Sequence, residues 1–127
     1  MSDAMGIFRI DVEVENPLRP GVRRVIRAAL VDTGSLLSWF PTQELEALGI
    51  PRLQKQRFRQ ANGTILERWT GLAFVRVDGR VTGDDVVFCE PGDLVLLGAR
   101  SLEGLNLLVD PARLRLVDAG PAPAAAA

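Results

Sequence analysis

Two turn dipeptides near the middle of the chain, Asn62–Gly63 and Asp78–Gly79, limit most strongly what it can fold into. Asn-Gly and Asp-Gly between apolar segments are typical of β-hairpins, because a type I′ turn needs positive φ at both of its central residues. We predict a two-residue type I′ hairpin at Asn62–Gly63, flanked by strands over residues 53–60 and 65–77, and another hairpin at Asp78–Gly79. The middle of the chain is thus expected to be antiparallel sheet.

The rest of the chain also consists of short segments. Apolar and charged residues alternate over residues 8–14 with the period of two that is typical of a half-buried strand. A short helix is predicted with Thr42 as its N-cap and Gly49 as its stop, and residues 99–105 predict a second one. We therefore expect a mainly-β fold, a small barrel or closed sheet with one or two short helices. Its remaining strands are predicted at residues 22–31, 86–89, 106–110 and 113–117.

Composition excludes several classes of function. The 127 residues carry a net charge of −1, so nothing draws the chain to nucleic acid in general. No apolar stretch approaches the roughly 20 residues of a membrane span, and the opening segment MSDAMGIFRI has no signal-peptide pattern. The single cysteine, Cys89, is expected to be a small buried apolar residue, and it fits a reducing, cytoplasmic location.

The chain also has no histidine. This excludes Ser-His and Cys-His catalytic pairs, and it leaves the usual zinc sites without their ligands. We expect no metal and no cofactor. If the protein is an enzyme, its acid–base chemistry falls on carboxylates.

One acid interrupts an apolar segment at Asp32, within ALVDTGSLLSWFP over residues 29–41. Asp, Gly and Ser are ordinary turn formers, so one interpretation is a simple turn. The other is that the apolar strand before Asp32 carries its carboxylate to a site. A second apolar segment, LVLLGAR, places Gly98 similarly later in the chain, and the predicted Asn62–Gly63 hairpin lies between the two.

These three segments, taken in this order, resemble those of the retropepsin-like (clan AA) aspartic proteases, in particular the single-domain prokaryotic type. In that family an apolar-apolar-Asp-Thr-Gly-Ser/Ala loop precedes a glycine-tipped flap hairpin, and an apolar-apolar-Gly segment leads into a helix. The matching segments here are LVDTGS (30–35), QANGT (60–64) and VLLGARSLEGL (95–105).

The resemblance extends over residues 8–117 and implies how the chain is organised. Residues 1–118 would form a retropepsin-like domain with a small closed-barrel fold, and residues 119–127 a disordered Pro/Ala-rich tail. Because the chain contains one Asp-Thr-Gly, the second catalytic carboxylate would come from an identical chain across a two-fold axis. The resemblance therefore implies a homodimer, with a polypeptide as its substrate.

The resemblance also implies roles for individual residues. Asp32 of each chain would be catalytic, one carboxyl taking a proton from water while the other gives a proton to the peptide carbonyl. An extended peptide would lie between the two active-site loops and the two flaps. Beside Asp32, Thr33 would brace the loops across the axis, Gly34 would permit close approach of the substrate, and Ser35 would hydrogen bond to Asp32; the flap is Ala61, Asn62 and Gly63, and the second apolar-glycine loop is Leu97 and Gly98.

The sequence departs from the viral members of the family in one respect. Those enzymes carry acids just after the Asp-Thr-Gly-Ala stretch, and these acids pair with an Arg directly after the later Gly. Here Leu36 and Leu37 stand at the acidic positions, and the later stretch reads Gly98-Ala99-Arg100. We therefore expect that ion-pair network to be absent. A dimeric peptide-binding module with weak or no catalysis is the alternative function.

Several other features have structural interpretations that we prefer to functional ones. The basic residues Lys55, Arg57 and Arg59 alternate along one strand and are interpreted as a solvated face rather than a nucleic-acid site. Trp39 and Phe40 are expected in the core rather than in a substrate pocket. The pair Asp84–Asp85 is interpreted as a charged turn rather than a cation site.

Overall fold

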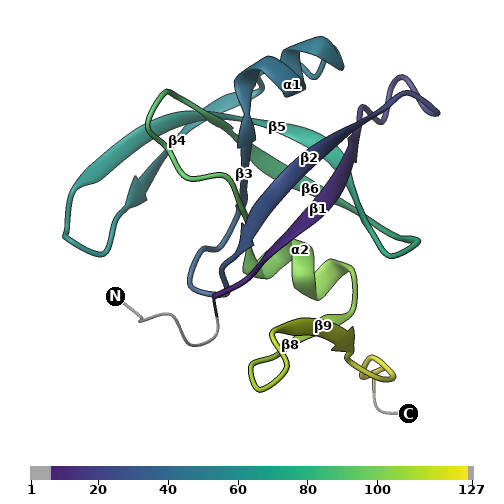
Figure 1. The fold of residues 1–127 in the computed structure, drawn as a ribbon. Coiled ribbons are helices and arrows are strands. Elements are labelled where there is room, and N and C mark those ends of the chain that lie inside the picture. The colour runs from purple at the N-terminus through teal and green to yellow at the C-terminus, as the bar shows by residue number, and fades with distance from the viewer. Residues whose placement is uncertain (1–6, 126–127) are drawn as a thin grey trace.

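The computed structural model describes residues 7–125 (Figure 1). Within these residues, nine strands and two short helices make a mainly-β fold, which confirms the predicted class. The elements are β1 (Arg9–Glu15), β2 (Arg23–Val31), β3 (Ser38–Pro41), α1 (Thr42–Ala47), β4 (Gln54–Arg59), β5 (Ile65–Val77), β6 (Arg80–Cys89), β7 (Leu96–Leu97), α2 (Ala99–Gly104), β8 (Leu107–Asp110) and β9 (Arg115–Asp118).

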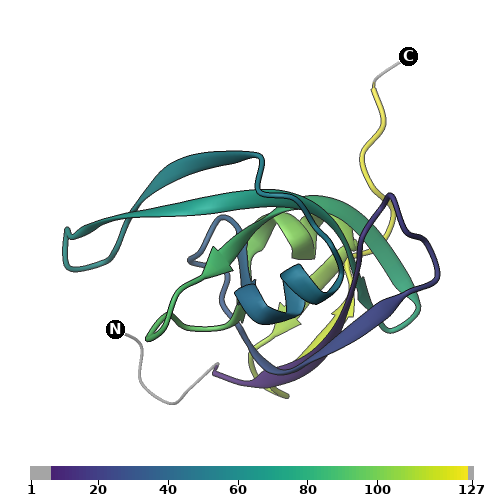
Figure 2. The same cartoon turned by 90° about the horizontal axis from the view of Figure 1, so that it is seen from above.

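Six of the strands form a closed ring. Their order is β1-β2-β7-β3-β6-β5, and β5 pairs back onto β1 through the antiparallel register of residues 13–15 with residues 74–76. β4 extends the sheet beyond β5, while β8 and β9 pair with each other as a separate two-stranded sheet. The β4–β5 hairpin projects from the ring as a long arm in both views (Figures 1 and 2).

The ring encloses an apolar core. Apolar and polar residues alternate along strands such as β1, so that the apolar side chains point inward. Val12 and Val14 of β1 are fully buried, as are Phe40 of β3 and Leu45 of α1. Other members of the core are Ile26, Ala29, Val31, Leu48, Ile50, Ala73, Val75, Val86, Phe88, Leu97, Leu102 and Leu105.

Within the described residues, neither helix has the length or the apolar character needed to span a membrane.

One of the two predicted hairpin turns is confirmed, and the other differs from the prediction. At Asp78–Gly79 both residues have positive φ, 51° and 77°, which confirms the predicted hairpin and makes this the type I′ turn. The prediction of a type I′ turn at Asn62–Gly63 is wrong. Gly63 alone has positive φ there, and the amide of Gln60 donates to the carbonyl of Thr64, so the loop has three residues, 61–63.

The N-cap of α1 also differs from the prediction. Pro41, not Thr42, occupies the cap position, and no side-chain hydrogen bond caps the helix. The hydroxyl of Thr42 instead donates to the carbonyl of Cys89, at 2.6 Å, and so ties the first helical residue to the end of β6. Gly49 does follow the helix with φ +71°, as expected of its stop.

The predicted tail begins with two residues that are attached to the domain. The amide of Ala119 donates to the carbonyl of Asn106, and the Asn106 side chain donates to the carbonyl of Gly120. Asn106 itself has φ +57°, a conformation that Asn tolerates well. Residues 126–127, which also belong to the predicted tail, lie outside the described residues.

A buried carboxylate holds the turn between β1 and β2. Glu15 is 2% exposed, and its Oε1 accepts a hydrogen bond from Nε of Arg76 at 2.8 Å. Its other oxygen accepts the amide of Gly21, and the guanidinium of Arg23 lies 3.7 Å away. The hydrogen bond from Gly21, followed by that from Arg76, lowers the pKa of Glu15.

Replacing Glu15 with Gln tests this interaction. Because the pKa of Glu15 is lower in the folded chain, its charge stabilises the fold above about pH 4.3, the ordinary glutamate value, and this stabilisation is lost as pH falls through the folded value. We expect Glu15→Gln to unfold at lower denaturant concentration than wild type at neutral pH, with the deficit shrinking in acid. Glu13→Gln, on the same strand, is the control; a deficit that does not change with pH would contradict the expectation.

Candidate active site

Parallel pairing of two strands brings the Asp32 loop and the Gly98 turn together. Leu30 and Val31 of β2 lie opposite Leu96 and Leu97 of β7. The amide of Asp32 then donates to the carbonyl of Leu97 at 3.0 Å. The two apolar segments singled out in the sequence are therefore neighbours, and both end at the same place in the fold.

The Asp32 side chain is held by its own loop. Asp32 is half-buried, and its Oδ1 accepts the amide of Gly34 at 2.9 Å. A Cβ at position 34 would lie 3.1 Å from that same oxygen, so the absence of a side chain at Gly34 avoids a tight contact with the Asp32 carboxylate. The prediction that Ser35 bonds to the outer carboxylate oxygen of Asp32 is wrong, because the Ser35 hydroxyl donates to the carbonyl of Leu37 at 2.8 Å. The Ser35 amide donates to the backbone carbonyl of Asp32 at 3.3 Å.

The loop after Asp32 also caps helix α2. The amides of Ala99 and Arg100 donate to the carbonyls of Ser35 and Leu36, at 2.7 and 3.0 Å. These amides are at the start of the helix, where no carbonyl of the helix itself can reach them. The Asp32 loop therefore completes the hydrogen bonding of α2, and the two cannot move independently.

Gly98 stands at the closest approach between the two segments. A Cβ there would lie 2.3 Å from the carbonyl oxygen of Leu37 and 2.9 Å from that of Ser35. These are backbone atoms, which cannot move aside as a flexible side chain would. The glycine of the second apolar segment is thus required by contact with the first.

A chain of buried hydroxyls lies behind this contact. The amide of Gly98 donates to the Ser38 hydroxyl at 3.0 Å, and the Ser38 and Ser101 hydroxyls are 2.7 Å apart. Ser101 in turn donates to Oδ2 of Asp84 at 2.9 Å. Both serines are fully buried and Asp84 is 5% exposed.

Asp84 is therefore not part of a charged turn, as its sequence context had indicated. It lies within β6, opposite Ala73 of β5. Its Oδ1 accepts the amide of Asp85 and lies 3.5 Å from the guanidinium of Arg100, which also reaches Asp85 at 3.8 Å. Burial raises the pKa of Asp84, and the bond from Ser101 and the charge of Arg100 offset this only in part.

The sequence did not single out Ser38 and Ser101, although a signal for them exists. Ser38 is a lone hydroxyl inside the otherwise apolar segment LLSWF, and Ser101 precedes Leu102 in the short segment GARSL, which also contains Arg100. A buried hydroxyl needs a hydrogen-bond partner, so such positions indicate a polar contact across the core. Arg100 stands one residue further from Gly98 than the Arg of the viral enzymes does, and in this chain it pairs with Asp84 and Asp85 of β6.

The predicted flap residues are not joined to this site. Ala61, Asn62 and Gly63 are exposed at the tip of the β4–β5 arm, and among the described residues no hydrogen bond or ion pair links them to residues 32–35. The structure thus brings the Asp32 loop and the Leu97–Gly98 loop together but leaves the tip of the hairpin apart from both (Figure 2).

The base of the arm is well anchored. Nε and an Nη of Arg68 in β5 donate to the two carboxylate oxygens of Asp93, at 2.7 and 2.9 Å. This bidentate bond lowers the pKa of Asp93. Nearer the tip, Trp39 packs edge-on against Phe58 of β4, which lies opposite Leu66, with ring centroids 5.1 Å apart. Trp39 is half-buried, so core packing is confirmed for Phe40 and not for Trp39.

The exposure predicted for the basic residues of β4 and the burial predicted for Cys89 agree with the structure. Lys55, Arg57 and Arg59 are all exposed, as expected of a solvated face. Cys89 is buried, which raises the pKa of its thiol to about 12. Among the described residues, no group of three or more His, Cys, Asp or Glu side chains is placed to hold a metal ion.

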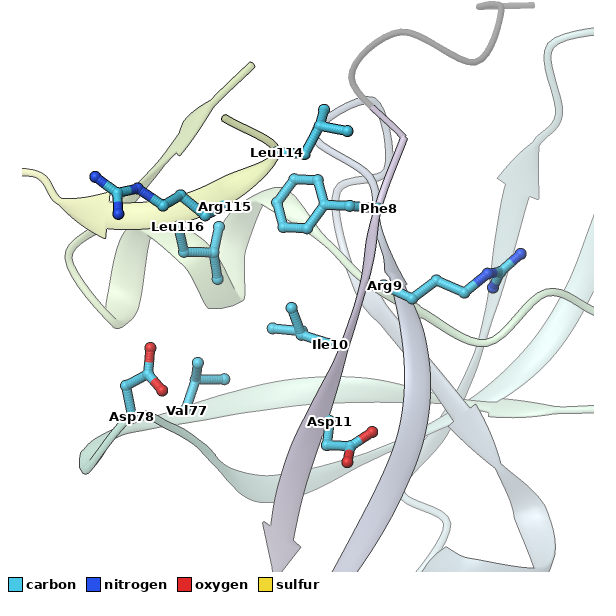
Figure 3. A pocket seen from close by; sticks show the side chains of 9 residues that line it. All are labelled: Phe8, Arg9, Ile10, Asp11, Val77, Asp78, Leu114, Arg115 and Leu116. Atoms are coloured by element: carbon cyan, nitrogen blue, oxygen red, sulfur yellow. The ribbon is translucent and has the colours of Figure 1, made fainter. Parts of the chain in front are cut away.

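Two hollows lie near the site without containing Asp32. One, of about 240 Å³, is lined by Thr33 together with residues of α2 and β8. The other, of about 600 Å³, lies between β1 and β9 and includes none of residues 32–35. Figure 3 shows Phe8, Ile10 and Leu116 pointing into it, while Arg9 points away.

No protein-family model matches this sequence, and comparison with curated proteins finds no match. Function must therefore be inferred from the residues of the site and from their geometry.

Replacing Gly98 with Ala tests the contact between the two loops. We expect Gly98→Ala to lower the free energy of unfolding by at least about 2 kcal/mol, because the new Cβ must displace backbone. Gly83→Ala is the matched control, since its Cβ would meet only the Phe74 ring at 3.6 Å, and we expect a change within about 0.5 kcal/mol. Equal effects in urea unfolding would show that the contact at Gly98 is not close.

Proposed function

We propose that this protein is a homodimeric aspartic endopeptidase of the retropepsin-like type, with Asp32 of each chain as the catalytic residue. The observation that supports this most is the joining of the Asp32 loop to the Gly98 turn by the pairing of β2 with β7. It makes one unit of two of the three segments on which the family resemblance depends, LVDTGS and VLLGARSLEGL. The exposure of Thr33 and Gly34, beside a half-buried Asp32, leaves this loop accessible to a second chain.

The chemistry needs two carboxyl groups that work as a pair. When two carboxyls approach within about 3 Å they cannot both ionise, and they share one proton. The ionised group then takes a proton from the attacking water, while the protonated group gives its proton to the peptide carbonyl oxygen. Each chain has a single Asp-Thr-Gly, so the pair forms only when two copies of Asp32 meet at a two-fold axis.

The proposed substrate is an extended polypeptide. Among residues 7–125, β4 is the last strand of its sheet and no further strand pairs with its outer edge. The backbone groups of such an edge favour addition of another strand. In the proposed complex the β4–β5 arm bends toward the Asp32 loop and covers the peptide. The tip carries Gly63 at φ +88°, the conformation that suits glycine in a tight loop.

Asp32→Asn separates the catalytic interpretation from the simple turn. Asn keeps the shape and can still accept the amide of Gly34, but it can neither take nor give the proton, so peptide hydrolysis should fall by roughly 10²- to 10⁴-fold. The thermal midpoint should hold or rise. Asp78→Asn, at a turn with φ +51° that Asn also tolerates, should match wild type in both measurements.

Cleavage of a diverse peptide library, with and without a statine-type inhibitor, measures this difference. An Asp32→Asn variant that cleaves like wild type would exclude the proposal. Binding of peptides by wild type without any cleavage would instead favour the peptide-binding module.

Dilution tests the requirement for two chains. If the site needs both copies of Asp32, specific activity should fall as the dimer of two 13.8 kDa chains dissociates by mass action. Light scattering at the same concentrations reports the dimer fraction, and the two curves should coincide. Full activity in a sample that is entirely monomeric would contradict the proposed site.

A further inference from the structure

We infer that Asp84 is a positioning residue for the candidate active site, acting through Ser101 and Ser38 to hold the Gly98 turn against the Asp32 loop. The inference rests on the proposed function for its kinetic consequences, while its structural part stands on the hydrogen bonds alone.

The hydrogen bonds that connect the Gly98 amide with Asp84 through the two serines can run in one direction only. Ser101 has a single hydroxyl proton, and it donates that proton to Asp84. In the 2.7 Å contact between the two hydroxyls, Ser38 must therefore be the donor. This leaves a lone pair of Ser38 to accept the amide of Gly98. The direction of each hydrogen bond thus depends on the following one, and the last acceptor in the series is the carboxylate of Asp84.

A carboxylate suits that end because it accepts on both oxygens. Oδ2 of Asp84 accepts from Ser101, while Oδ1 accepts the amide of Asp85 and faces the guanidinium of Arg100. An amide at this position would have to turn its NH₂ group toward one of these donors. Turned toward Ser101, it would reverse the direction of these hydrogen bonds. Ser38 would then accept from both Ser101 and the Gly98 amide, which can only donate, and the hydroxyl proton of Ser38 would be left without an acceptor among these groups.

At its other end, this series of hydrogen bonds reaches the Gly98 amide, in the backbone that positions Asp32. Gly98 lies between Leu97, whose carbonyl accepts the amide of Asp32, and Ala99, whose amide donates to Ser35. A shift of the Gly98 peptide would move both ends of residues 32–35. Small misplacements of a reacting group cost about 10²-fold in rate. Loss of the hydrogen bonds between Asp84 and Gly98 should therefore reduce turnover.

The groups that face Asp84 also make it responsive to pH. Arg100 approaches from α2 and favours the ionised form, Asp85 approaches from the same strand and disfavours it, and Ser101 donates to it. Burial outweighs the favourable contacts and raises the pKa of Asp84. Protonation should therefore occur above the ordinary aspartate range, and it should be felt at the Gly98 amide through the two hydroxyls.

Two measurements on the full chain test this inference. The first follows the Gly98 amide resonance of wild type across acidic to neutral pH, and it requires no catalysis. We expect a titration above the ordinary aspartate range that disappears in Ser38→Ala and persists in Asp85→Asn. Asp85→Asn is the matched control, because it removes a charge beside the same Arg100 without touching either serine. A Gly98 resonance that does not titrate, or that titrates equally in Ser38→Ala, would overturn the inference.

The second measurement is peptide hydrolysis by Asp84→Asn, Ser38→Ala and their double variant. We expect kcat to fall by roughly ten- to a hundredfold with KM changed less than about twofold, and the double variant to be no slower than the slower single variant. Wild-type kcat in both folded single variants would overturn the positioning role. If wild type cleaves nothing while its Gly98 amide titrates through Ser38, the chain of hydrogen bonds stands and the proposed protease function fails.

Discussion

The candidate site depends on a contact between two stretches of backbone. β2 and β7 pair over only two residues each, and beyond them Gly98 lies so close to Leu37 that a single methyl group would not fit. Everything near Asp32 is attached to this contact: its amide bonds to Leu97, and the carbonyls of its loop cap α2. Because backbone groups make these bonds, the arrangement tolerates many side chains around it but only glycine at position 98.

Two buried carboxylates show how differently the same fold can treat a negative charge. Glu15 and Asp84 are 2% and 5% exposed. Glu15 accepts from a backbone amide and from Arg76 at 2.8 Å, and its pKa is lowered. Asp84 has a hydroxyl, a backbone amide and a half-exposed guanidinium at 3.5 Å, and its pKa is raised. Partners that fall short of the desolvation cost leave a group that is easily protonated.

Sequence reasoning succeeded where local patterns decide the structure. The strand period, the Asp78–Gly79 turn and the two short helices follow from neighbours in the chain. It failed at Asn62–Gly63, where one further residue enters the loop, and at Asp84, where two adjacent acids looked like a solvated turn. The side chains that contact Asp84 come from α2. One of them, Ser101, contacts Ser38 of β3, 63 residues away in the chain, a pairing that no local pattern encodes.

The β4–β5 arm shows how the fold separates a fixed part from a free one. Toward its base, Arg68 donates two hydrogen bonds to Asp93, and nearer the tip Trp39 packs on Phe58, which lies opposite Leu66. At its tip, the hydrogen bonds that residues 60–64 make within the described part of the chain are with one another. Local bonds of this kind open at low cost in free energy, whereas a bidentate, half-buried ion pair does not. For the proposed enzyme, closure over a peptide therefore has to occur by bending of the strands beyond Arg68, with the Arg68–Asp93 pair as its fixed end. Because Phe58 lies in that distal part, the same motion has to break its contact with Trp39 or carry Trp39 along.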